Sequence, residues 1–116
     1  MKPPAKKKDD SFRLFVADAL SGLEGLRIRP MFGGHGLYLK DDFFGMAWKG
    51  DLYFRADDET RPLYEENGSK PFCVTMRGKK MTMQYYSVPA DVLEDHEELA
   101  RWAVRAARAY RESKKK

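Results

Sequence analysis

Apolar residues recur at helical spacing near both ends of this chain and alternate with polar residues in the middle. The first helical face comprises Phe12, Phe15, Val16, Ala19 and Leu20. Residues 9–11 provide N-cap oxygens at the start of this helix, and Gly22 and Gly25 end it. The pattern therefore predicts one amphipathic helix followed by a strand-rich middle.

The middle of the chain has a period of two, which is typical of strands with one buried face. Three strands are expected, over residues 31–40, 43–49 and 52–56, with a glycine-rich break at 33–36. The turn candidates between them are Asp41–Asp42 and Gly50–Asp51. A short helix is expected over residues 59–67, because Pro62 fits a first helical turn.

A hairpin and a final helix complete the pattern. Residues 72–77 and 81–86 alternate around a turn at Gly78–Lys79. The final helix starts near Asp95, which has capping-box spacing to Glu98. Its apolar face comprises Leu99, Trp102, Ala103, Ala106 and Tyr110. We predict an α+β fold of order α-β-β-β-α-β-β-α, with an antiparallel meander and a hairpin in one sheet against packed helices.

Charge separates the two ends of the chain from its middle. The net charge is +4, yet residues 9–110 carry 14 basic and 17 acidic side chains. Residues 1–8 hold four lysines and no acid, and residues 112–116 hold three lysines. We expect a disordered basic tail over residues 1–8, one domain over 9–111 and a second basic tail over 112–116.

Length and composition favour a cytoplasmic domain that folds without disulfides. The chain has 116 residues, of which 42% are hydrophobic, enough for one core. Its one cysteine, Cys73, cannot form an internal disulfide, and no segment has the roughly 18 apolar residues of a membrane span. We expect no membrane contact and see no secretory signal.

One glycine-rich motif is the clearest candidate for chemistry, and it comprises Met31, Phe32, Gly33, Gly34 and Gly36. We favour a bend or bulge in a strand, because no helix follows whose N-terminus could hold a phosphate. The two histidines, His35 and His96, form no zinc spacing with Cys73, and no catalytic elbow surrounds that cysteine. We predict no catalytic residue, cofactor or metal, and we assign the motif a structural role.

Two further patterns leave alternatives open. Arg101, Arg105 and Arg108 on the final helix, with Lys114 beyond them, could contact nucleic-acid phosphates or form a solvated face paired with nearby glutamates. Six methionines and many aromatic residues exceed what one covered sheet face needs. These apolar side chains could stack on nucleotides, pack under helices, bind a partner or bury the second face in a homodimer.

Several motifs, taken in order, resemble the TfoX (Sxy) N-terminal domain family. They are Arg29–Tyr38, Asp51–Arg55, Thr60–Pro62, Gly68–Phe72 and Met83–Pro89. The resemblance implies an α+β fold of the secretion-chaperone type and a link to regulation of natural competence. Full-length members are thought to act as transcriptional co-activators with the cyclic-AMP receptor protein and carry a second domain. The resemblance therefore makes this chain a stand-alone, single-domain member, and it implies no catalytic or ligand residues.

Two functional hypotheses follow from these observations. The first is a non-enzymatic regulatory domain that acts through protein–protein contacts, with a transcription regulator or a second copy of the chain as its partner. The alternative is direct, low-specificity binding of nucleic acid through the basic tails and the arginine-bearing helix.

Overall fold

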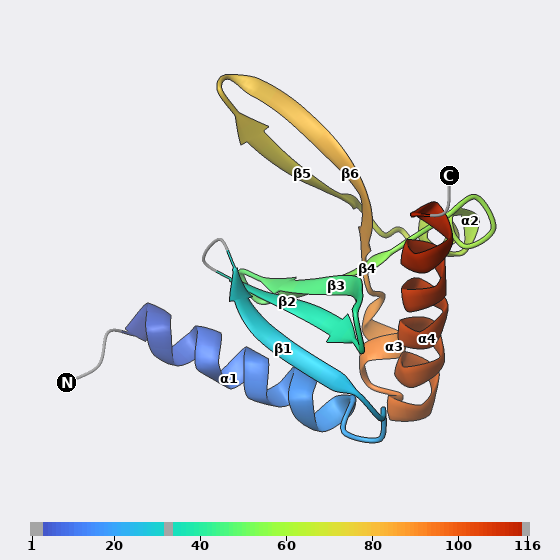
Figure 1. The fold of residues 1–116 in the computed structure, drawn as a ribbon. Coiled ribbons are helices and arrows are strands. Elements are labelled where there is room, and N and C mark those ends of the chain that lie inside the picture. The colour runs from blue at the N-terminus through green and yellow to red at the C-terminus, as the bar shows by residue number, and fades with distance from the viewer. Residues whose placement is uncertain (1–3, 32–33, 115–116) are drawn as a thin grey trace.

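Six strands form one antiparallel sheet and four helices pack around it in the computed structural model, which describes residues 4–31 and 34–114 (Figure 1). The elements are α1 (Pro4–Ala19), β1 (Leu26–Met31), β2 (Gly34–Leu39), β3 (Asp42–Trp48), β4 (Asp51–Arg55), α2 (Arg61–Glu66), β5 (Pro71–Met76), β6 (Lys79–Ser87), α3 (Ala90–Leu93) and α4 (His96–Ser113). The strand order is β1-β2-β3-β4-β6-β5. The α+β class and the union of meander and hairpin in one sheet are confirmed.

Two elements, β1 and α3, were absent from the expected order. In β1, Leu26 and Ile28 pack against the core, whereas Arg27 and Arg29 are exposed, so the segment alternates as a strand does. The expected single strand over 31–40 was wrong, because β1 ends at Met31 and pairs antiparallel with β2, which begins at Gly34. The glycine-rich motif therefore lies at a connection between two strands rather than at a bend inside one.

Both terminal helices extend beyond their expected limits. Helix α1 begins at Pro4, ahead of the start expected at residues 9–11, and α4 continues to Ser113. Proline is favoured in a first helical turn, and the alanine and lysines that follow Pro4 are good helix formers. The expected cap of α4 is confirmed, since the Asp95 side chain accepts a hydrogen bond from the Glu98 amide at 3.2 Å.

Two of the hairpin turns lie one residue earlier than expected. They are Lys49–Gly50, with φ values of 52° and 81°, and Arg77–Gly78, with φ values of 54° and 80°. Positive φ at both central residues matches the right-handed twist of the flanking strands, and glycine is favoured at the second position. The expected turns at Gly50–Asp51 and Gly78–Lys79 placed the glycine first, which explains the error.

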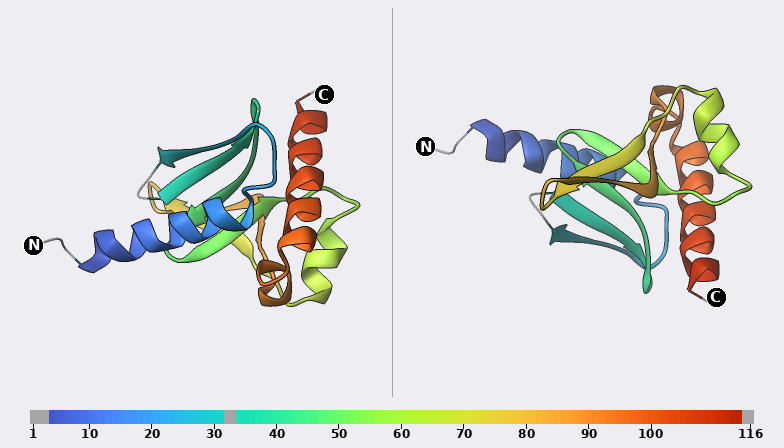
Figure 2. Two further views of the ribbon diagram at one scale, coloured as in Figure 1. Left: turned by 90° about the horizontal axis from the view of Figure 1, so that it is seen from below. Right: turned by 90° about the horizontal axis from the view of Figure 1, so that it is seen from above.

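The core lies between α1, α4 and the face of the sheet that we call the inner face. Val16 and Leu20 of α1 meet Leu37 and Phe54 of the sheet, and all four are almost completely buried. Seen from below, α1 crosses the sheet and α4 runs along its side (Figure 2). Both helices therefore cover the inner face with their apolar residues.

A bulge in β3 gives the opposite, outer face its own apolar residues. The β2–β3 register shifts between Leu37 and Tyr38, so Phe44 joins the inner core while Phe43 belongs to a cluster on the outer face. Gly45 sits in the bulge, where an added Cβ would lie 2.5 Å from the Tyr53 carbonyl oxygen. The strand can bend there because glycine leaves this space empty.

The end of the β5–β6 hairpin projects from the sheet as a separate arm, which we define as residues 73–83 (Figure 1). Residues 85–87 of β6 pair with β4, whereas the arm strands pair only with each other. The β5–β6 register shifts between Pro71 and Cys73, at the base of the arm. Irregular pairing of this kind bends a ribbon away from its sheet.

Candidate interaction surfaces

The glycine-rich motif serves close packing between strands in the part that the structure describes. An added Cβ on Gly34 would lie 2.5 Å from the Ala47 carbonyl oxygen and 2.7 Å from Trp48 Cδ1. Gly36 is buried opposite Met46. Met31 ends β1, and Phe32 and Gly33 lie outside the described residues.

The histidines and the cysteine lie on different elements. His35 is half-buried in β2 opposite Ala47, and His96 begins α4. Cys73 is half-buried in β5, where its thiol donates to the Pro71 carbonyl oxygen at 3.7 Å. Within residues 4–31 and 34–114, no three metal-ligating side chains gather in one place.

The described hollows are too small for an organic ligand. One lies between α2 and α4, lined by Arg55, Tyr64 and Arg105, and another lies between Phe12 and His35. Each has a volume of about 10 Å³, which is about the space of one water molecule.

The acidic residues around Asp57 organise a turn. The Asp57 carboxylate accepts hydrogen bonds from the amides of Glu59 and Thr60 and from the Thr60 hydroxyl, at 2.9–3.0 Å. Burial alone would raise the pKa of Asp57, but these hydrogen bonds and nearby Arg105 together lower it below its usual value. The side chain therefore stays ionised as a structural group at the start of α2.

The arginines of α4 each have an acidic neighbour. Arg101 donates to Glu98, Arg108 donates to Glu112 at 3.2 Å, and Arg105 is close enough to Asp57 to affect its pKa. Hydrogen bonds from Arg101 and Trp102 lower the pKa of Glu98. Lys114 lies over the ring of Tyr110, at 5.3 Å. The four proposed nucleic-acid contacts therefore face carboxylates or a ring within their own chain.

The outer-face cluster comprises Phe43, Met46, Trp48, Tyr53, Phe72 and Tyr85. Phe72 lies at its centre, with ring-centroid distances of 5.2 Å to Trp48 and 5.0 Å to Tyr53. The Tyr85 hydroxyl donates to the Phe43 carbonyl oxygen at 3.3 Å, and burial raises the pKa of Tyr85 to about 12. These contacts tie the base of the arm to β3 and β4.

The outer-face cluster keeps an accessible rim. Phe43, Trp48 and Tyr53 are only half-buried, and Met83 in the adjoining arm is 38% exposed. The inner helices do not cover this side, because α1 and α4 contribute their buried residues to the inner core, and only Tyr110 reaches the rim, beside Phe43. Seen from above, the arm lies in front of the sheet on this side (Figure 2).

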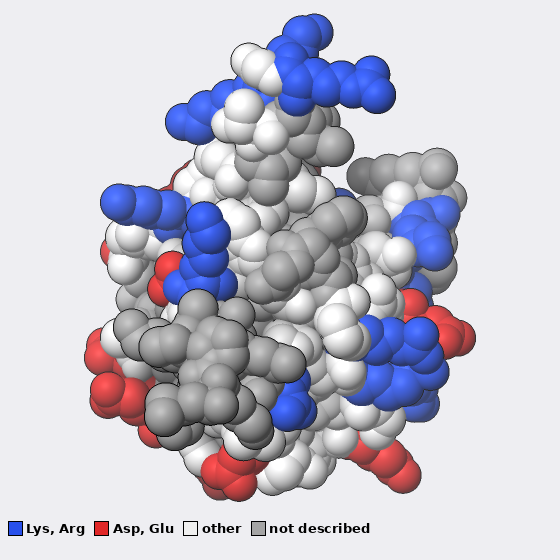
Figure 3. All heavy atoms as spheres, turned by 90° about the vertical axis from the view of Figure 1, so that its left-hand side faces the viewer, with Lys and Arg blue, Asp and Glu red and all other residues white. Residues whose placement is uncertain are grey.

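The arm also carries a basic tip that was not recognised from the sequence. Arg77, Lys79 and Lys80 are all exposed there, and none of the three forms an ion pair with a described residue. The tip carries blue groups and no red one in the space-filling view (Figure 3). The signal was present in the sequence, since residues 67–90 contain four basic side chains and no acidic one.

These features define a small α+β domain built on one antiparallel sheet, with an apolar rim and a basic arm on its outer side. Residues 18–110 match the TfoX N-terminal domain family, and the chain belongs to this family. No curated protein matches the chain significantly. None of the helices in the described part of the chain is long and apolar enough to span a membrane.

Proposed function

We propose that this chain is a non-enzymatic regulatory domain of the cytoplasm, which acts in transcription regulation by binding a protein partner through the rim of the outer-face cluster. The observation that carries this proposal is the accessible apolar rim of Trp48, Tyr53 and Met83 on the side of the sheet away from α1 and α4. Contiguous exposed apolar groups mark contact sites, and methionine and aromatic residues are enriched there. Membership of the TfoX N-terminal domain family supports a regulatory role.

The chemistry of the rim suits a protein better than a small ligand. Trp48 and Tyr53 offer large ring surfaces with polar edges, and Met83 offers a flexible chain that adapts to different partners. The described hollows hold only about one water molecule each, so binding there would occur on a surface rather than in a pocket. The ion pairs of α4 leave that helix less suited to the nucleic-acid alternative.

A charge placed on the rim tests the proposal. Met83→Lys adds a charge at an exposed position, so the fold should be retained, and Val104→Lys makes the same change on α4, where Val104 is 48% exposed. Proteins captured by the wild-type chain from extract of the source cells would be identified, purified and titrated individually. We expect a transcription regulator whose affinity falls at least tenfold with Met83→Lys, about 1.4 kcal/mol, and is unchanged with Val104→Lys.

The opposite pattern would overturn the proposal. A purified partner that tolerates Met83→Lys but is lost with Val104→Lys would place the contact on α4 instead. Sedimentation of the chain alone shows whether a second copy is the partner, since Met83→Lys would then turn a dimer into a monomer.

A further inference from the structure

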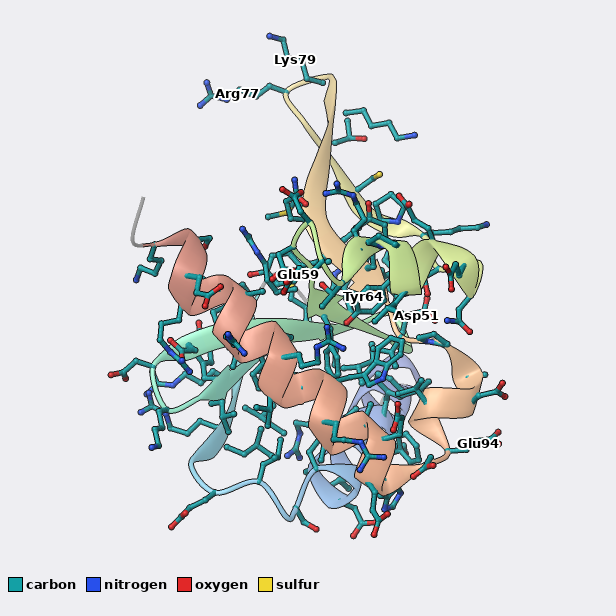
Figure 4. All side chains as sticks on the ribbon, turned by 90° about the vertical axis from the view of Figure 1, so that its right-hand side faces the viewer. Asp51, Glu59, Tyr64, Arg77, Lys79 and Glu94 are labelled. Carbon is teal, nitrogen blue, oxygen red and sulfur yellow. The ribbon has the colours of Figure 1, made fainter. Side chains whose placement is uncertain are left out.

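Charge is distributed unevenly between the arm and the rest of the molecule. Residues 67–90 carry Lys70, Arg77, Lys79 and Lys80 and no acid, whereas residues 9–66 and 91–110 together carry 17 acidic and ten basic side chains. The side-chain view shows Arg77 and Lys79 at the tip of the arm, pointing away from the body, while Asp51, Glu59 and Glu94 lie on the body (Figure 4). The molecule therefore presents a positive arm on a negative body.

Distance separates the tip from the acids of the body. Lys79 and Tyr85 stand at opposite ends of the stretch of β6 that runs from the tip to the sheet, which at about 3.3 Å per residue spans about 20 Å. The Debye length at physiological ionic strength is about 8 Å. The charges at the tip are therefore largely screened from the acidic body, and they can attract an anion that the body repels.

The shape of the arm limits which anion it can reach. A two-stranded ribbon fits the major groove of duplex DNA, where phosphates line both edges. In the arm, Thr75 pairs with Lys80 across the ribbon, and the Arg77–Gly78 turn makes a narrow tip without bulky side chains beyond it. A thin, purely basic projection suits a groove lined by phosphates better than the broad, mixed surface of an acidic protein.

We propose that the arm is a nucleic-acid-binding element, which inserts its tip into the major groove of duplex DNA and contacts phosphates through Arg77, Lys79 and Lys80. This activity is separate from the protein contact proposed for the rim. Contacts to phosphates carry no sequence information, so the arm binds with low specificity. It supplies a DNA contact that the ion-paired arginines of α4 do not.

The test is a salt titration of binding to a fluorescent duplex of about two helical turns, followed by anisotropy with the full chain. The arm variant is Arg77→Asn, Lys79→Gln, Lys80→Gln, in which asparagine tolerates the positive φ of 54° at position 77. Two controls remove the same charge elsewhere: Lys114→Gln with Lys115→Gln and Lys116→Gln, and Arg101→Gln with Arg105→Gln and Arg108→Gln. Circular dichroism and thermal melting verify that every variant is folded.

Three phosphate contacts predict a contribution of about −2.7 to the slope of log affinity against log salt, which is about a 40-fold loss between 50 and 200 mM. We expect the arm variant to lose this component and to weaken binding at 50 mM salt at least about 30-fold, while both controls stay within a few-fold of wild type. Equal binding by the arm variant and wild type would overturn the proposal, as would an equal loss in either control. Binding of poly-glutamate but not of the duplex would also overturn it, because the arm would then recognise acidic protein.

Discussion

Replacing Gly34 with alanine should destabilise the protein far more than an alanine at an open glycine. The new Cβ would lie 2.5 Å from the Ala47 carbonyl oxygen, about 0.8 Å inside a normal carbon–oxygen contact of about 3.3 Å. It would also lie 2.7 Å from Trp48 Cδ1. The oxygen belongs to the paired β3 backbone, so neither neighbour can rotate away without opening the β2–β3 pairing.

The cost follows from these two overlaps. Overpacking costs about 1–3 kcal/mol, and a contact with backbone places Gly34→Ala at the upper end, about 3 kcal/mol. For a chain of this length each kcal/mol lowers Tm by about 4 °C, so the expected decrease is about 12 °C. Urea unfolding should show a lower midpoint with an unchanged slope, because the native and unfolded surfaces stay the same.

Gly22→Ala is the matched control for this prediction. No heavy atom lies within 4 Å of an added Cβ at Gly22, so we expect its Tm to stay within about 2 °C of wild type. If Gly34→Ala melted with Gly22→Ala, the reasoning that the motif exists for close strand packing would be refuted.

Three further predictions concern a cap and two titrating groups. Asp95→Ala should lower stability by about 1 kcal/mol in urea unfolding, whereas Asp95→Asn, which keeps an acceptor for the Glu98 amide, should lower it much less. Because the pKa of Asp57 is lowered in the folded state, its contribution is present above about pH 4 and is lost as pH falls through the lowered value, so Asp57→Asn should flatten the acid limb of a stability–pH curve. Because the pKa of Tyr85 is raised from 10.0 to about 12, its contribution is present below pH 10 and is lost between pH 10 and about 12, so Tyr85→Phe should reduce the alkaline loss of stability.

Local patterns in the sequence predicted the elements that depend on local physics. The apolar stripe and Asp95 cap located α4, and alternation located the β5–β6 hairpin. The same reasoning failed at β3, because the bulge sends the neighbours Phe43 and Phe44 to opposite faces and breaks the period of two. It also passed over β1, where arginines alternate with only two large apolar residues.

Features that depend on distant segments could not be predicted in this way. Nothing in the local pattern places β6 beside β4, a pairing that joins Phe54 to Tyr86 across an intervening helix and strand. The projection of the arm follows from that pairing, so its basic tip did not stand out as a site. The four lysines and arginines of residues 67–90 were visible as residues, but only the fold separates them from the acids of the body.

The pairing of the arm has a consequence for amide hydrogen exchange. An isolated two-stranded hairpin is only marginally stable in water, and the strands of the arm pair only with each other. Their amides should therefore exchange through local opening, whereas Tyr86, buried and paired with Phe54 of β4, should exchange only through global unfolding. A single strand, β6, thus contains one of the least protected and one of the most protected regions of the molecule, with the boundary near Gln84.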